Sequence, residues 1–197
     1  MDKSLDFYFD VGSPAAYLAW TQLPALCLEA GATLNYKPML LGGVFQATGN
    51  RPPISVPLKG SYLFNDLGRF ARRYGVPFRL NPYFPVNTLT LMRIAAGLEM
   101  RTDARLESYL RAVFDAIWSG DKNMADLATL AEVLQAASLD AAGLMALAAE
   151  PQVKERLRLQ TEAAVARGVF GAPTMFVGDT LYWGQDRLDF VREALSA

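Results

Sequence analysis

A chain of 197 residues, 52% of them hydrophobic, is long enough for one large domain or for a small domain with an insertion, and it can bury a sizeable core. Its 19 basic and 20 acidic residues give a net charge of −1 without runs of like charge, so we expect neither a nucleic-acid partner nor a membrane-surface partner. The N-terminus lacks the apolar core of a signal peptide, and no stretch approaches the roughly 18 apolar residues of a membrane span, so we expect a cytoplasmic protein.

Two features of the composition narrow the possible chemistry. The chain has no histidine, which excludes Ser-His-Asp and Cys-His catalysis and removes the usual zinc ligand, so we predict no metal site. Its single cysteine, Cys27, lies in an apolar stretch typical of a buried helix face. A lone cysteine cannot form an internal disulfide, and a buried one is usually inert, so we expect no catalytic thiol in the protein.

The first predicted elements are a strand and a helix that meet at Ser13. Residues 5–10 alternate apolar and polar side chains with the period of a strand, and the pattern stops at Gly12. Ser13 is a preferred N-cap residue, and Pro14 suits the first helical position. Because a helix N-terminus carries partial positive charge and unbonded N–H groups, an anion beside the Ser13 hydroxyl would be stabilised. An N-cap bond to its own helix is the simpler interpretation of Ser13.

The next elements complete a strand–helix–strand unit. The helix, which Pro24 is expected to kink, ends at Gly31, and a second strand follows over residues 33–37. The crossover should be right-handed, with the two strands parallel. Residues 39–50 are apolar but rich in glycine, and we interpret them as a loop.

The middle of the chain is predicted to be helical, and strand patterns return only near its end. Residues 173–177 and 180–183 are short apolar runs joined by Gly178 and Asp179, which predicts an antiparallel hairpin, and a last helix carries Leu188. The order βαβ, helices, ββα therefore indicates an α/β protein in which a helical insertion interrupts one sheet domain. The helices predicted in the middle cover residues 63–74, 103–118, 127–134, 140–149 and 153–166.

Four motifs, found in order over residues 7–14, 49–53, 169–176 and 183–188, carry a resemblance to a known family. The chain resembles the DsbA-like proteins of the thioredoxin fold, with Ser13-Pro14-Ala15-Ala16 in the place of their Cys-x-x-Cys. Within that group it is similar to 2-hydroxychromene-2-carboxylate isomerases and kappa-class glutathione transferases. The resemblance implies a thioredoxin-like domain formed by residues 1–40 and 168–197, and a helical insertion domain over residues 41–167.

The resemblance also implies a function. We expect a glutathione-dependent isomerase that interconverts 2-hydroxychromene-2-carboxylate, a small aromatic carboxylate, and trans-o-hydroxybenzylidenepyruvate. Ser13 would be catalytic, donating a hydrogen bond to the thiolate of glutathione, the cofactor. Family members are generally dimeric, so a homodimer is expected. Disulfide exchange is excluded because Ser13 and Ala16 occupy the two cysteine positions.

Further site residues are implied by the resemblance alone. Pro173 is expected to be cis, with the backbone of Ala172 offered to the cysteinyl part of glutathione. Gln185, Asp186 and Arg187 are expected to bind its γ-glutamyl end, although Asp186 could also cap the last helix. The remaining expected glutathione contacts are Asn50, Lys59 and Trp183, and the expected substrate contacts, which could equally be core or surface residues, are Phe45, Arg51, Tyr83 and Asn87.

Two other functions remain open at the level of sequence. A kappa-like glutathione transferase or peroxidase would use the same site but consume glutathione. A thioredoxin-like binding module or chaperone would use the helical domain to hold an apolar partner and would not bind glutathione. An assay of free thiol during turnover separates the two enzymes, and a glutathione titration separates both from the binding module.

Overall fold

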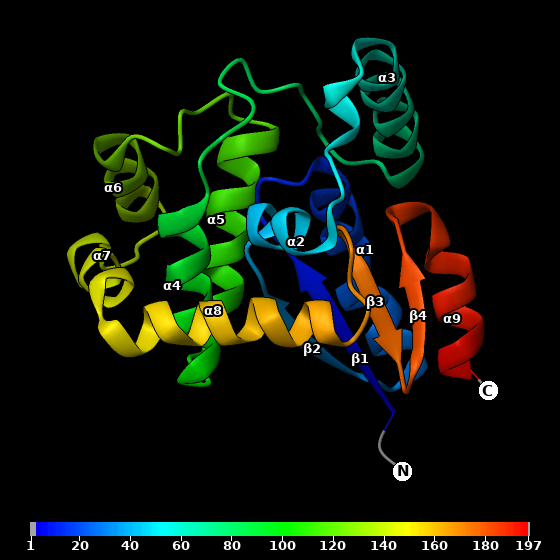
Figure 1. Ribbon diagram of the computed structural model, residues 1–197. Helices are drawn as coiled ribbons and strands as arrows, with labels where there is room; N and C mark the ends of the chain where they lie inside the picture. The colour runs from blue at the N-terminus through cyan, green and yellow to red at the C-terminus, as the bar shows by residue number, and fades with distance from the viewer. Residues whose placement is uncertain (1–2, 197) are drawn as a thin grey trace.

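The computed structural model describes residues 3–196, in which a four-stranded sheet has helices on both faces (Figure 1). The strand order is β2-β1-β3-β4, with β1 parallel to β2 and antiparallel to β3, and β3 antiparallel to β4. The predicted parallel unit and the predicted hairpin are therefore both confirmed. The strands are β1 (Ser4–Phe9), β2 (Thr33–Pro38), β3 (Thr174–Val177) and β4 (Thr180–Trp183).

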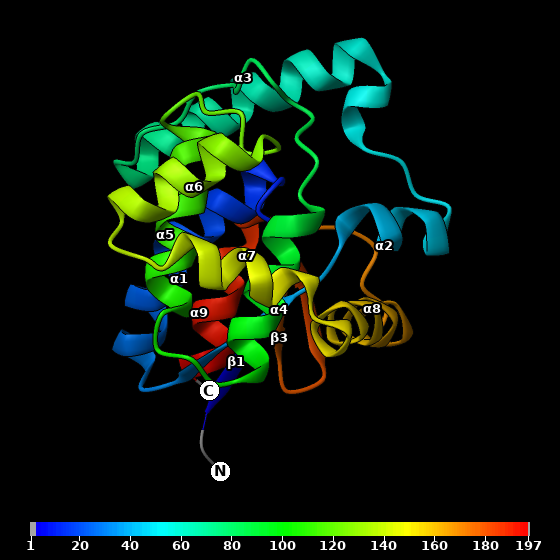
Figure 2. The ribbon, with the colours of Figure 1, turned by 90° about the vertical axis from the view of Figure 1, so that its left-hand side faces the viewer.

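Helices connect β1 to β2 and β2 to β3, and a last helix follows β4. In Figure 1, α8 crosses in front of the strands and α1 lies behind them, while α4 to α7 form a separate group beside the sheet. Figure 2 shows the chain between α2 and α3, drawn in cyan, extending away from this body. The helices are α1 (Pro14–Ala30), α2 (Leu41–Thr48), α3 (Pro57–Tyr74), α4 (Leu89–Met100), α5 (Leu106–Trp118), α6 (Leu127–Ala136), α7 (Ala141–Ala149), α8 (Pro151–Ala166) and α9 (Leu188–Ser196), with short 3-10 turns η1 (Pro53–Ser55) and η2 (Gln185–Arg187).

Both faces of the sheet are buried. Phe7 and Phe9 on β1 join the large core that includes α1 and α5, whereas Tyr8 belongs to a smaller cluster with Val44 of α2 and Ala164 of α8. The alternation over residues 5–10 therefore places successive side chains on opposite faces of the sheet, and helices cover both faces. Helices α2 and α8 cover the second face of the sheet. Both lie within residues 41–167, the range predicted as the helical insertion, so part of that range packs as a layer of the sheet domain.

The first helix begins and ends where the sequence predicts. The Ser13 side chain accepts a hydrogen bond from the backbone N–H of Ala16, and Gly31 ends the helix with a φ of 62°. The helix continues through Pro24. Cys27 is buried in it, and burial raises the pKa of this thiol to about 11, which agrees with the expected inert cysteine.

Two helices were not predicted. The expected loop over residues 39–50 is wrong, because residues 41–48 form α2. Their Gly42 and Gly43 indicated a break, but Gly43 lets α2 approach α8, since a Cβ there would lie 3.2 Å from the Thr161 methyl carbon. Helix α4 had no predicted counterpart. Its residues 91, 92 and 94–98 are all buried, so its sequence lacks the polar stripe of a surface helix.

The packing of α4 against α7 depends on Gly97. A Cβ at this position would lie 2.8 Å from Leu147 Cγ. We expect Gly97→Ala to lower the free energy of unfolding by about 1–2 kcal/mol, because overpacking outweighs the gain in helix propensity. Gly68→Ala in α3 is the control, since its Cβ would be 3.7 Å from the flexible end of Arg72, and it should be stabilising. Urea unfolding followed by circular dichroism measures both, and equal stabilisation by the two changes would contradict tight α4–α7 packing.

Candidate active site

The centre of the candidate site is the turn between β1 and α1 that holds Ser13. This side chain is only 5% exposed, and its oxygen caps α1. Its hydroxyl also donates a hydrogen bond to the carbonyl oxygen of Ala172 at 3.1 Å. The structure therefore brings together two predicted site residues that are 159 positions apart in the chain.

Ala172 is followed by Pro173 at the start of β3, and the peptide bond between them is cis, as the resemblance implies. The carbonyl of Pro173 accepts a hydrogen bond from Gly184 N at 3.0 Å, which fixes it to the chain after β4. Within residues 3–196 the N–H of Ala172 has no hydrogen-bond acceptor. An unpaired N–H next to a carbonyl is the pair of groups that an extended peptide uses when it adds to a sheet edge.

A buried carboxylate, Asp10, holds the Ser13 turn to the helical part of the chain. It is 2% exposed and accepts hydrogen bonds from Gly12 N at 2.9 Å, Leu41 N at 2.9 Å and Thr88 Oγ1 at 3.1 Å. The Asp10 carbonyl accepts from Ser13 N at 3.0 Å. Burial raises the pKa of this carboxyl, although its three hydrogen bonds act in the opposite direction.

Two further side chains hold the same turn from the helices. Trp118 of α5 donates its indole N–H to the Val11 carbonyl at 2.9 Å, and the Val11 N–H lies 3.4 Å from the sulfur of Met92 in α4. Asp10, Met92 and Trp118 were not among the predicted site residues. Only Asp10 had a usable signal, because it ends the first strand just before Gly12 and Ser13.

A second part of the candidate site lies around Asn50 and Trp183. The Asn50 side chain donates to the Phe170 carbonyl at 2.8 Å and accepts from Arg51 N at 2.8 Å. The rings of Phe170 and Trp183 lie 5.1 Å apart. Trp183 is 47% exposed, so it is not a core residue. Asn50 thus ties the loop after α2 to the segment that leads into the cis proline.

The turn η2 carries the three residues predicted to bind the γ-glutamyl end of glutathione. Gln185 is buried, and its carbonyl accepts a hydrogen bond from the Tyr74 hydroxyl at 2.7 Å, which joins α3 to this turn. Asp186 forms a partly exposed ion pair with Arg187 at 2.6 Å. Within residues 3–196 the Asp186 side chain accepts a hydrogen bond from Arg187 and from no backbone N–H, so it does not cap the turn or the last helix. The carboxylate therefore remains partly open to solvent, opposite a cation that a ligand amine could replace.

Within residues 3–196 none of the other predicted residues forms a hydrogen bond with Ser13. Lys59, in the first turn of α3, and Arg51 are exposed and have no ion-pair partner within residues 3–196. Asn87 accepts a hydrogen bond from Leu89 N at 3.1 Å and so supports the start of α4. Phe45 is half-buried on α2, and Tyr83 is 53% exposed. The structure therefore separates a compact centre, Ser13 with Ala172 and Pro173, from an exposed outer set.

The fold and this centre define the class of protein. The chain matches the DSBA-like thioredoxin domain over residues 4–196, and it belongs to that family. This confirms the predicted fold. Within the described residues no helix has the length and apolar content to cross a membrane, and no cluster of three or more potential metal ligands occurs.

Comparison with individual proteins is more specific. 2-Hydroxychromene-2-carboxylate isomerase of Sphingobium xenophagum is 34% identical over 197 residues, covering 99% of both chains. A solved structure of a selenomethionine 2-hydroxychromene-2-carboxylate isomerase superposes with a TM-score of 0.84 at 33% identity, covering 98% of this chain and 94% of that one. Human glutathione S-transferase kappa 1 is 26% identical over 207 residues, covering 99% of this chain and 92% of that protein. The chain is thus an enzyme, and its end-to-end relatives support an isomerase role.

Proposed function

We propose that the protein is a glutathione-dependent isomerase that interconverts 2-hydroxychromene-2-carboxylate and trans-o-hydroxybenzylidenepyruvate. The observation that carries this proposal is the Ser13 hydroxyl at the N-terminus of α1, bonded to the carbonyl of Ala172 beside the cis proline. In this position a thiolate would meet a hydroxyl donor and the positive end of a helix together. Both interactions favour the charged form of a thiol and lower its pKa from roughly 8.5 toward neutrality.

Glutathione would bind Ala172 in the manner of an added strand. Its cysteinyl N–H would donate to the Ala172 carbonyl, and its cysteinyl carbonyl would accept from the unpaired Ala172 N–H. The Ser13 hydroxyl, which now donates to that carbonyl, would then turn to the sulfur. The ligand would therefore replace one hydrogen bond of the unliganded site and leave no polar group unpaired.

The thiolate would act as a nucleophile that is returned at the end of each turnover. Its addition forms a carbon–sulfur bond at a conjugated carbon and turns the double bond of the substrate into a single bond. The ring opens, the single bond rotates, and elimination breaks the carbon–sulfur bond and restores the double bond. No net oxidation occurs, and glutathione is regenerated. Because the protein lacks histidine, a thiol already ionised by its surroundings suits this chemistry.

The outer residues suit the charged ends of the ligands. Lys59 and Arg51 are exposed cations without an ion-pair partner in residues 3–196, so either can take the glycine carboxylate of glutathione or the carboxylate of the substrate. Asp186 can bind the γ-glutamyl ammonium group by exchanging its Arg187 partner. A homodimer and a cytoplasmic location remain predictions, and sedimentation of the purified protein tests the first.

A titration with glutathione followed by turnover tests the proposal. We expect saturable binding and a bound thiol whose pKa, read from thiolate ultraviolet absorbance, lies at least one unit below that of free glutathione. With 2-hydroxychromene-2-carboxylate as substrate, product should form while the concentration of free thiol stays constant. Loss of one thiol per turnover would instead identify a transferase, and failure to bind glutathione would favour a non-catalytic binding module.

A further inference from the structure

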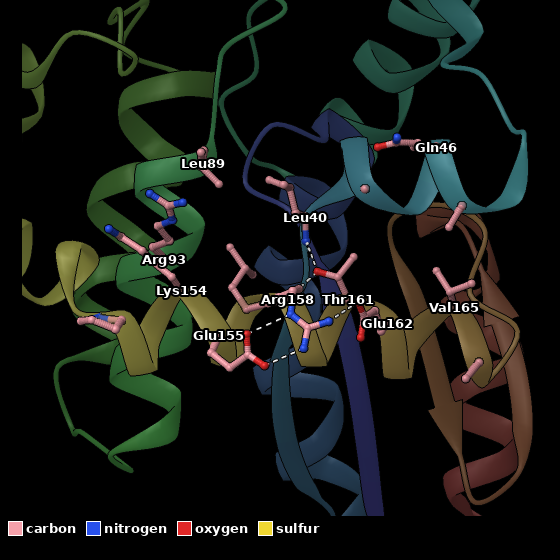
Figure 3. A pocket seen from close by; sticks show the side chains of 15 residues that line it. Leu40, Gln46, Leu89, Arg93, Lys154, Glu155, Arg158, Thr161, Glu162 and Val165 are labelled. Atoms are coloured by element: carbon pink, nitrogen blue, oxygen red, sulfur yellow. Dashed lines mark hydrogen bonds and ion pairs between the residues drawn. The ribbon is translucent and has the colours of Figure 1, made fainter.

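A large open pocket lies between α2, α4 and α8, and no residue of the turn that holds Ser13 lines it (Figure 3). Its volume is about 1030 Å³. Ligand pockets for small organic molecules occupy roughly 300–1,000 Å³. The apolar part of its wall is formed by Leu40, Leu89 and Leu157, with Gly43 and Ala47 contributed by α2. None of the predicted glutathione or substrate residues lines it, so the proposed function does not use this space.

One end of the pocket carries two uncompensated positive charges. Arg93 of α4 and Lys154 of α8 line the pocket, and Figure 3 shows both side chains at the end nearest α4. Neither has an ion-pair partner within residues 3–196. Two cations beside apolar surface therefore form the polar part of the site.

The acidic residues around the pocket are already paired with other cations. Glu155 and Glu162 both contact Arg158, at 2.5 Å each. Glu150, at the start of α8, contacts Arg101 at 2.6 Å. Glu155 and Glu162 share the single guanidinium of Arg158, so the three cations and two carboxylates that line the pocket leave it a net charge of +1. Since no carboxylate of the described residues forms an ion pair with Arg93 or Lys154, both side chains are available to an added anion.

We propose that this pocket binds a small organic acid, with its carboxylate held by Arg93 and Lys154 and its apolar ring or chain packed over Leu40, Leu89 and Leu157. A planar carboxylate suits the two N–H groups of one side of a guanidinium, and the lysine adds a second charged donor. The apolar wall favours an aromatic or alicyclic body over a free inorganic anion, which would leave the leucine side chains exposed to water.

Two residues that line the pocket, Leu40 and Leu89, are next in the chain to residues that hydrogen-bond to Asp10. The N–H of Leu40 donates to Thr161 Oγ1 at 3.0 Å, the N–H of Leu41 donates to the Asp10 carboxylate, and Leu89 follows Thr88 in the chain. The pocket and the Ser13 turn therefore share supporting backbone but no lining residues. Binding in the pocket can be measured independently of glutathione binding.

Calorimetric titration of the full chain with 2-naphthoate tests the proposal. We expect one saturable site in the wild type, at least tenfold weaker binding in the Arg93→Gln/Lys154→Gln double variant, and unchanged binding in the Arg51→Gln/Lys59→Gln double variant, which lacks the two cations proposed to hold the substrate carboxylate. Lys122→Gln is the matched control, because Lys122 is also an exposed lysine without an ion-pair partner in the described residues but lies outside the pocket. The neutral analogue 2-naphthalenemethanol should bind at least tenfold more weakly than 2-naphthoate.

A second variant tests whether binding needs the open volume of the pocket as well as its two cations. Ala47→Trp places a large ring in the open part of the pocket while keeping both cations, and it should also weaken 2-naphthoate binding at least tenfold. The proposal is overturned if the wild type shows no saturable binding, or if the double variant binds as the wild type does. It is also overturned if Arg51→Gln/Lys59→Gln abolishes binding, because the probe would then occupy the substrate site proposed near Ser13. The 2-naphthoate titration does not require glutathione binding, so these outcomes can be interpreted even if the glutathione titration fails.

Discussion

Replacing Ser13 with alanine is expected to lower kcat/KM for the isomerisation by about 10²–10³-fold, which is the usual effect of removing one donor to a developing or resident anion in a closed site. The Ser13 hydroxyl is the side-chain donor proposed to meet the sulfur, and Ser13 is 5% exposed, so bulk water does not replace it freely. The pKa of the bound glutathione thiol should rise toward its value in solution. Stopped-flow turnover and thiolate absorbance measure the two effects.

The control for this change is another N-cap. Ser13→Ala also removes the cap of α1, which costs about 1 kcal/mol of stability. Asp126→Ala removes the cap of α6, where the aspartate accepts from Thr129 N at 2.9 Å, and it should cost a similar amount without changing turnover or the thiol pKa. If Ser13→Ala loses stability but keeps its activity, then Ser13 is only a cap and the proposed mechanism is wrong.

The sequence predicted the sheet well because local signals and tertiary structure agree there. The predicted strands over residues 33–37 and 180–183 are bounded by glycine or proline on each side, and each forms a strand in the structure. Helices α2 and α4 were missed for opposite reasons. Two glycines in α2 are typical of a loop, and only the packing of α8 against Gly43 shows why one of them is there. Helix α4 is buried on so many sides that no amphipathic period remains. Both helices depend on contacts that are distant in sequence.

The meeting of Ser13 with the segment before the cis proline could be predicted, but the hydrogen bonds that support the Ser13 turn could not. Ser13, Ala172 and Pro173 lie in short motifs that resemble those of a known family, and the structure brings them into contact. Asp10 lies in one of the same motifs, but nothing in its local sequence shows that its carboxylate meets residues 41 and 88. A hydrogen bond to a residue far along the chain leaves no periodic pattern, and only the fold reveals it.

The network around Asp10 joins three parts of the chain at the site. Its carboxylate accepts from the turn that precedes α1, from the first residue of α2 and from the residue before α4. Thr88 also packs closely on Gly12, where a Cβ would lie 2.9 Å from the threonine methyl carbon. Asp10 is therefore a positioning residue, which fixes the Ser13 turn against the helical part of the protein without itself touching a ligand.

Asp10→Ala is expected to lower the free energy of unfolding by about 3–5 kcal/mol, because it leaves three buried donors without an acceptor. It should also lower kcat/KM by about tenfold or more and raise the pKa of the bound glutathione thiol, since a displaced turn misplaces the Ser13 hydroxyl. Thr88→Val, which removes a single donor from the same network, should cost only about 1 kcal/mol and change turnover little. Urea unfolding and steady-state kinetics measure these effects.

The pH dependence of the free energy of unfolding of Asp10→Ala gives a separate test of the pKa of the Asp10 carboxyl. Burial raises its pKa in the folded protein above the ordinary value of 3.8, so the folded state binds this proton more tightly than the unfolded state does. The stability that Asp10 contributes is therefore greatest at and below that ordinary value, and it falls as the pH rises through the folded pKa. The difference in free energy of unfolding between wild type and Asp10→Ala should accordingly be larger at pH 4 than at pH 8. A difference that grows with pH would show that the hydrogen bonds from Gly12, Leu41 and Thr88 outweigh burial and lower the pKa instead.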